Sequence, residues 1–267
     1  QAVDPRIEQV LTQLGKAQSI QAVAISPDGR QLAWVIERDH KPAIEVADAD
    51  GSHAHAVTAA STPGTCAESG IAWAPDSRHL AFISNCRIDL TSTRVMQNAI
   101  YLADTAGRDK PAQLAQLGGY VRALQWTADG KSLGFLYVAG ATRHASAVAA
   151  AKLPAGEIGV SGIEVQRVAA VDVANDHFSI VTPANLHVSE FDWAPDSHQI
   201  AFVAAAPPGE NTWWIAQLYT ENLSSSNLKT SALRSILDTQ KITGPLNGMQ
   251  IALPRWFTEG TRIALIG

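Results

Sequence analysis

The chain of 267 residues lacks the features of several protein classes. No stretch approaches the roughly 18 uninterrupted apolar residues of a membrane-spanning helix. Its 20 lysines and arginines form no run and are outnumbered by 25 aspartates and glutamates, which argues against nucleic acid as a partner. Because 46% of the residues are apolar and 17% are charged, the composition is not that of a disordered chain. We therefore expect a globular protein with no membrane span.

Signatures of catalysis and cofactor binding are also missing. The sequence has no Gly-x-Ser-x-Gly nucleophile elbow, and the nearest string, residues 159–163, lacks the final glycine. There is no glycine-rich loop to hold a phosphate. His53 and His55, near Asp48 and Asp50, match no strong metal-ligand spacing. The sequence therefore predicts no catalytic residue, no metal site and no cofactor within this chain.

A motif that occurs five times organises the sequence. In each copy an acid is followed four residues later by an aliphatic residue, and in four copies a tryptophan precedes the acid by three residues. The copies are AISPDGRQLAW from Ala24, AWAPDSRHLAF from Ala72, QWTADGKSLGF from Gln125, DWAPDSHQIAF from Asp192 and RWFTEGTRIAL from Arg255. Alternating apolar positions around a Pro-Asp-Gly type turn predict a β-hairpin. Because the acids recur, we interpret Asp28, Asp76, Asp129 and Asp196 as turn formers.

Each of the first four hairpins is followed by a further apolar strand, a polar turn and another strand. Such four-stranded antiparallel units have the size of propeller blades. We predict an all-β protein, a β-propeller with four complete blades and half of a fifth in this chain. An N-terminal segment, 1–20, is expected to be partly helical, and 21–267 to be an incomplete propeller. The predicted blades lie near 21–60, 68–117, 120–182, 186–240 and 249–267.

The repeated hairpin resembles the repeat of TolB-like propellers. It equally resembles the propeller of prolyl oligopeptidase family serine peptidases, including dipeptidyl-peptidase-like and acylaminoacyl-peptidase-like members. The long insertion at 139–162 favours the peptidases, and the stretches 182–193 and 207–219 look like their bacterial members. The resemblance implies a propeller that caps an α/β-hydrolase domain, which we expect beyond residue 267. Such a propeller screens substrates by size and helps to bind the peptide N-terminus.

The loops between the second and third strands of each blade are expected to face that hydrolase domain. An exopeptidase needs a carboxylate to neutralise the ammonium of its substrate, and Glu210, followed by Glu157, is the candidate. Asn211 is expected to hold a peptide carbonyl or terminus, and Trp213 and Trp214 to line an apolar subsite. A solvated turn acid and strand packing are the plainer interpretations of Glu210 and of the tryptophan pair.

Cys66 and Cys86 flank the second hairpin, and their midpoint lies in its turn. Facing positions on paired strands are within disulfide range, so we predict a disulfide. The alternative is two free thiols in a cytosolic protein. A disulfide indicates an oxidising compartment, and the expected location is periplasmic or secreted.

The sequence thus leads to two hypotheses. In the first, the chain is the N-terminal propeller of a serine exopeptidase, inactive by itself, whose partners are a peptide substrate and its own hydrolase domain. A homodimer is compatible with the sequence. In the second, it is a non-enzymatic, TolB-like periplasmic propeller that binds proteins through the channel mouth or a rim.

Overall fold

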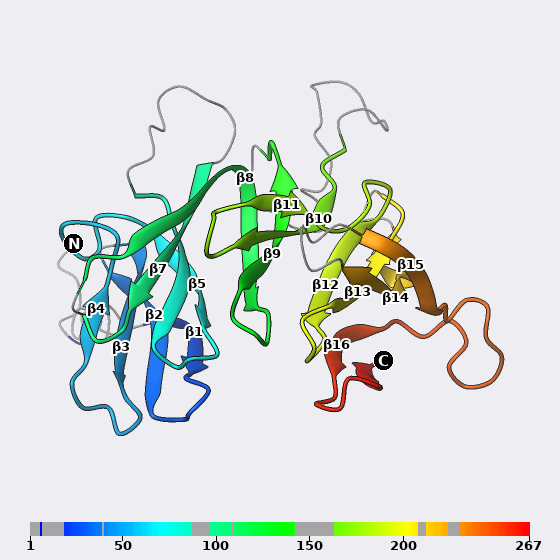
Figure 1. Cartoon of the computed structure of the whole chain (residues 1–267), viewed down its shortest axis with the longest axis horizontal. Helices are drawn as coiled ribbons and strands as arrows, with labels where there is room; N and C mark the ends of the chain where they lie inside the picture. The colour runs from blue at the N-terminus through cyan, green and yellow to red at the C-terminus, as the bar shows by residue number, and fades with distance from the viewer. Residues whose placement is uncertain are drawn as a thin grey trace.

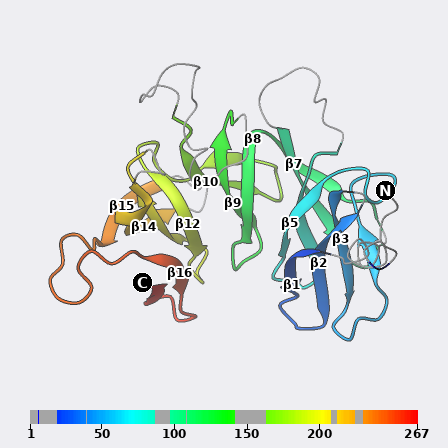
Figure 2. The same cartoon turned by 180° about the vertical axis from the view of Figure 1, so that it is seen from behind.

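A computed structural model describes residues 6, 19–38, 40–86, 97–107, 109–141, 163–207, 212–223 and 230–267. Within these ranges the chain is built from antiparallel sheets that stand beside one another (Figures 1 and 2), so the predicted all-β propeller class is confirmed. The helical segment expected within 1–20 lies almost entirely outside the described residues.

In the described ranges the strands form four hydrogen-bonded sheets. The first sheet holds β1 (Ile20–Ile25), β2 (Gln31–Arg38), β3 (Lys41–Asp48) and β4 (His55–Val57). The second holds β5 (Glu68–Trp73), β6 (His79–Ser84), β7 (Gln97–Asp104), β8 (Ala112–Trp126), β9 (Ser132–Ala139), β10 (Gln166–Asp172) and β11 (Phe178–Ile180). The third holds β12 (His187–Trp193), β13 (Gln199–Ala205), β14 (Gln217–Leu223) and β15 (Thr230–Leu237), and the last holds β16 (Ala252–Trp256) and β17 (Ile263–Ile266).

The second sheet has seven strands because β8 serves two expected blades. Its first part pairs with β7 as far as Gly118, and its second part pairs with β9 from Gly119 onward. Gly119 has a φ of 150°, and a Cβ atom there would lie 2.1 Å from the Val138 carbonyl oxygen. Only glycine fits this crossover point. The predicted blades near 68–117 and 120–182 are thus joined by one continuous strand, β8.

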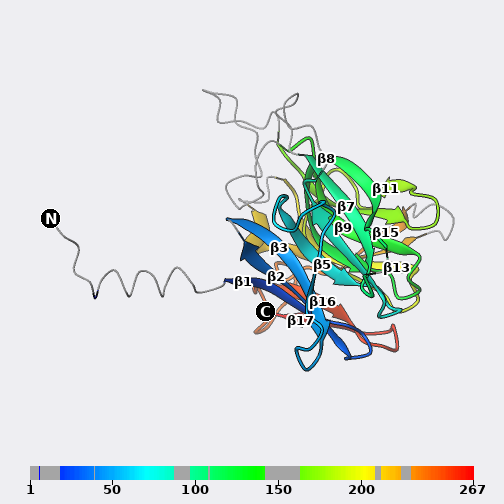
Figure 3. The same cartoon turned by 90° about the vertical axis from the view of Figure 1, so that its left-hand side faces the viewer.

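The first strands of the successive units line the middle of the molecule. They contact one another in the order β1, β5, β8, β12 and β16, while β4 and β15 lie at opposite margins (Figure 1). The turns that follow these strands lie along the lower edge, and in the side view the β16–β17 hairpin lies at that lower end (Figure 3). We call this the turn face, formed by residues 26–30, 74–78, 127–131, 194–198 and 257–262. We call the opposite face, where the second strand of each unit ends and the third begins, the loop face.

The apolar core is divided among the spaces between neighbouring units. Val35 and Ile44 pack with Phe82 between the first two units. Similar clusters fill the next two spaces, and Leu218 and Ile251 belong to the cluster that joins the third sheet to the last one. The packing therefore couples each unit to its two neighbours along the chain.

The repeated tryptophans tie one unit to the next. Three indoles each donate their Nε1–H to a backbone carbonyl in the first strand of the preceding unit. In that strand, the accepting residue lies one position before the repeat's tryptophan position. The bonds are Trp73 to Ala24 at 3.3 Å, Trp126 to Ala72 at 3.0 Å and Trp193 to Gln125 at 3.2 Å. The indole nitrogen of Trp256 is buried without a hydrogen-bond partner among the described residues.

The repeated aspartates form turns, as interpreted from the sequence. Each Oδ1 accepts the backbone N–H two residues later: Asp28 from Arg30, Asp76 from Arg78, Asp129 from Lys131 and Asp196 from His198. Two of these turns are also joined to the next unit, because the Asp28 N–H donates to the Ser77 hydroxyl at 3.0 Å and the Asp129 N–H to that of Ser197 at 3.1 Å. These carboxylates belong to the scaffold.

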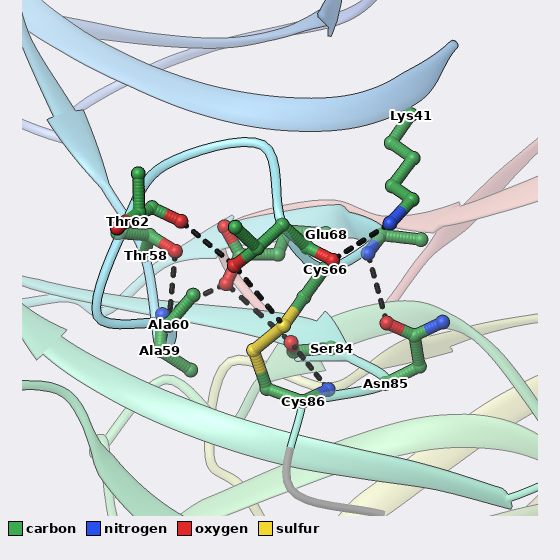
Figure 4. The surroundings of a disulfide bond; sticks show 12 residues. Lys41, Thr58, Ala59, Ala60, Thr62, Cys66, Glu68, Ser84, Asn85 and Cys86 are labelled. Carbon is green, nitrogen blue, oxygen red and sulfur yellow. Dashed lines mark hydrogen bonds between the residues drawn. A yellow bond between two sulfur atoms is a disulfide. The ribbon is translucent and has the colours of Figure 1, made fainter. Parts of the chain in front are cut away.

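The predicted disulfide is present. Cys66 and Cys86 are joined across β5 and β6 with a Cα–Cα distance of 5.3 Å (Figure 4). Beside it lies Glu68, a fully buried residue whose Oε1 accepts the Ala59 N–H at 2.7 Å. Its Oε2 has no hydrogen-bond partner among the described residues, and burial raises the pKa of this carboxyl. The disulfide and Glu68 together fix the connection between the first two sheets.

Candidate functional site

Two of the predicted binding residues lie on the loop face. Trp213 and Trp214 begin η1 (Trp213–Ile215), a short 3-10 turn between β13 and β14, and expose 51% and 49% of their surface. Glu157, Glu210 and Asn211, the other predicted binding residues, lie outside the described residues.

A pocket of about 390 Å³ opens at this face, between the third sheet and the last one. Trp213 lines it, together with Val203, Ile251 and the acidic residue Glu190, whereas Trp214 is not among its lining residues. Glu190 lies on β12, directly after the irregular pairing between Val188 and Glu190. The pocket thus combines an indole wall with one acid.

Glu190 also holds the last sheet in place. Its Oε2 accepts the backbone N–H of Leu253 on β16. Two residues later on the same side of β12, Asp192 accepts the Trp256 N–H at 2.8 Å. The strand alternation that places these acids on one face was readable in the sequence, but their shared partner, β16, lies more than 60 positions away. Neither Glu190 nor Asp192 is among the residues predicted from the sequence.

A guanidinium lies on the same face between β8 and β12. Arg122 donates from Nε to Gln166 at 3.0 Å and from Nη2 to the carbonyl of Ser189, a pocket-lining residue, at 3.4 Å. Nearby His187 accepts the Gln166 N–H at 3.3 Å. Burial, reinforced by the charge of Arg122, lowers the pKa of His187 to about 4, so its ring is neutral at pH 7. This cluster fixes a positive charge beside the loop-face pocket.

A second hollow opens on the turn face, at the mouth of the space between the first strands. Its volume is about 580 Å³, and all five repeats line it. The lining residues are Pro27, Ala72, Trp73, Pro75, Leu124, Gln125, Trp126, Thr127, Ala128, Asp192 and Arg255. We call it the turn-face hollow. Of the described residues that line it, Asp192 and Arg255 are the ones with a formal charge, so these two groups dominate its electrostatics.

Asp192 and Arg255 differ in their burial and in their hydrogen bonds. Burial raises the pKa of Asp192, opposed by the Trp256 N–H and by the charge of Arg255. Arg255 is exposed, and its Nη1 donates to the Pro254 carbonyl at 2.7 Å. The acid is therefore anchored to β16, while Arg255 is an exposed lining residue of the hollow.

Two other kinds of feature are absent from the described part of the chain. No group of three or more His, Cys, Asp or Glu side chains in it is placed to hold a metal ion. No helix in it is long and apolar enough to cross a bilayer.

No sequence-family model and no curated protein matches the chain. Solved protein structures, in contrast, do match the chain. A putative TolB from Agrobacterium tumefaciens matches 81% of this chain with a TM-score of 0.50 at 15% identity, over 64% of its own length. TolB from Acinetobacter baumannii matches 98% with a TM-score of 0.51 at 18% identity, over 50% of its length. An acylaminoacyl peptidase bound to Z-Gly-Gly-Phe-chloromethyl ketone matches 88% with a TM-score of 0.53 at 15% identity, over 33% of its length. The chain therefore spans less than two thirds of each of these proteins and shares with them the β-propeller fold.

Proposed function

We propose that this chain is the N-terminal propeller of a serine exopeptidase of the dipeptidyl- or acylaminoacyl-peptidase type. Its loop face would meet a hydrolase domain beyond residue 267 and bind the N-terminus of the peptide substrate there. One observation carries the proposal: the predicted subsite residue Trp213 and an acidic residue, Glu190, line the same loop-face pocket. The disulfide favours the oxidising compartment in which a periplasmic or secreted peptidase works.

The pocket suits a peptide with a free ammonium. A carboxylate pairs with an ammonium through charge-assisted hydrogen bonds, and an indole face attracts both a cation and an apolar side chain. Glu190 would hold the terminal ammonium, and Trp213 would contact the first side chain. Acyl transfer itself would belong to a Ser-His-Asp triad on the hydrolase domain. The propeller would select and orient the substrate.

Calorimetric binding of Leu-Leu-Leu-NH2 to this chain tests the pocket. Trp213→Ala and Glu190→Gln should each weaken binding about 10-fold, the equivalent of about 1.4 kcal/mol. The glutamine oxygen keeps an acceptor for Leu253, so the second variant should leave the sheet contact intact. Trp214→Ala is the matched control, since this equally exposed neighbour does not line the pocket. Equal binding of the acetylated peptide, or an equal loss in the control, would contradict the proposal.

The turn-face hollow favours a second candidate, the non-enzymatic propeller that binds proteins at its channel mouth. The intact mass of the full-length protein, with and without a fluorophosphonate probe, separates the two. A mass far above 28.4 kDa with one adduct supports the peptidase. A mass near that value without an adduct supports the binding protein.

A further inference from the structure

The turn-face hollow has one apolar side and one charged side. Trp73, Trp126, Leu124 and Pro75 line it from the second and third repeats. Aromatic and proline surfaces of this kind bind apolar groups by contact and water release. A ligand that fits the hollow therefore brings an apolar portion to this side.

The charged side presents a positive group. Arg255 is exposed and lines the hollow, its Nη1 donates to the Pro254 carbonyl, and its charge also acts on the nearby Asp192. Asp192, in contrast, is partly buried, and its carboxylate already accepts the Trp256 N–H. A guanidinium offers parallel N–H donors that match a carboxylate in a bidentate arrangement.

We propose that the turn-face hollow is a binding site for a carboxylate carried by an apolar peptide, with Arg255 as the anion-binding residue. The carboxylate comes from a free C-terminus or from an acidic side chain. The tryptophan and leucine wall holds the neighbouring apolar side chain. This site is distinct from the loop-face pocket in position and in charge preference, and it does not depend on the exopeptidase proposal.

Asp192 gives the proposal a second, opposite prediction. Its negative charge lines the same hollow and opposes an incoming carboxylate. Asp192→Asn keeps an oxygen that accepts the Trp256 N–H and removes that charge. The variant should therefore bind an acidic ligand more tightly. A site built for a cation would respond in the opposite direction.

The test is calorimetry with Ac-Leu-Leu-Leu-OH and Ac-Leu-Leu-Leu-NH2. The wild-type chain should bind the acid at least about 10-fold more tightly than the amide, and Arg255→Gln should abolish this preference. Arg234→Gln is the matched control, because it removes the same charge from the exposed outer strand β15. A third peptide, Ac-Leu-Leu-Glu-NH2, distinguishes the two sources: tighter binding than Ac-Leu-Leu-Leu-OH assigns a side-chain carboxylate, and weaker binding assigns the C-terminus.

Three results would overturn the proposal: equal binding of acid and amide, a preference that survives Arg255→Gln, or weaker binding of the acid by Asp192→Asn. A thermal melt of each variant checks that the fold is intact. Every probe is acetylated, so the ammonium site at Glu190 does not contribute. Failure here is therefore separable from failure of the exopeptidase proposal, which is tested with a free N-terminus.

Discussion

A buried carboxylate with one unpartnered oxygen makes Glu68 sensitive to pH. Its Oε1 is bonded, but its Oε2 has no hydrogen-bond partner among the described residues, and burial raises its pKa above the ordinary 4.5. Between pH 4.5 and the raised pKa of the folded state, the folded protein keeps a proton that the unfolded chain has released. The stability that this group contributes is therefore fully present below about pH 4.5 and is lost as the pH rises through the folded pKa.

Glu68→Gln removes this titration while keeping an oxygen for the Ala59 N–H. Relative to the wild type, the variant should gain stability as the pH rises from about 4.5 through the raised pKa of Glu68 in the folded protein, and the difference should then level off. Urea unfolding of both proteins at several pH values, at constant ionic strength, measures the difference. A difference that does not change with pH would show that Glu68 does not titrate in this window.

For single residues, the sequence predicts roles that depend on neighbours along the chain. It does not predict roles that depend on contacts with distant segments. The turn role of Asp28 follows from a bond to a backbone group two residues away, which residue type and position predict. Glu190 and Asp192 act on β16, and Arg255 meets Asp192 only because two repeats fold side by side. No pattern within one repeat contains that information.

At the scale of the element, the hairpins were predictable because turn chemistry and alternation are local signals. The continuous β8 was not. Its course through residues 118 and 119 depends on the close approach of the Val138 carbonyl from β9, which a sequence pattern does not display. The disulfide could be predicted from the hairpin, since the hairpin that pairs β5 with β6 also brings Cys66 and Cys86 together.

The disulfide should supply a large part of the stability of its own region. It closes a loop with a sequence separation of 20 residues. A cross-link of this span lowers the conformational entropy of the unfolded chain and so stabilises the folded state by about 3 kcal/mol. We expect the double variant Cys66→Ala/Cys86→Ala to lose about that much unfolding free energy in urea. The wild type in excess reductant should match the double variant. A loss below about 1 kcal/mol would show that packing alone fixes this connection.

For the whole molecule, the structure predicts that the indole bonds join the units into one cooperative assembly. Trp126 Nε1 donates to Ala72 at 3.0 Å across one such boundary, whereas Trp256 Nε1 is buried with no hydrogen-bond partner among the described residues. Trp→Phe removes the same ring atoms at both positions but breaks a hydrogen bond only at Trp126. We therefore expect Trp126→Phe to lower the unfolding free energy by about 1 kcal/mol more than Trp256→Phe, because the partly buried carbonyl of Ala72 loses its hydrogen-bond donor.

Equilibrium urea unfolding, followed by far-UV circular dichroism, measures both variants and avoids signals that depend on tryptophan number. The slope of each transition reports whether the protein still unfolds as one unit. If the boundary bonds couple the units, Trp126→Phe should also broaden the transition, while Trp256→Phe should keep the wild-type slope. Equal losses at the two positions would mean that apolar packing, rather than the repeated indole bond, holds neighbouring units together. The conserved offset of tryptophan and turn acid within this chain would then reflect packing volume alone.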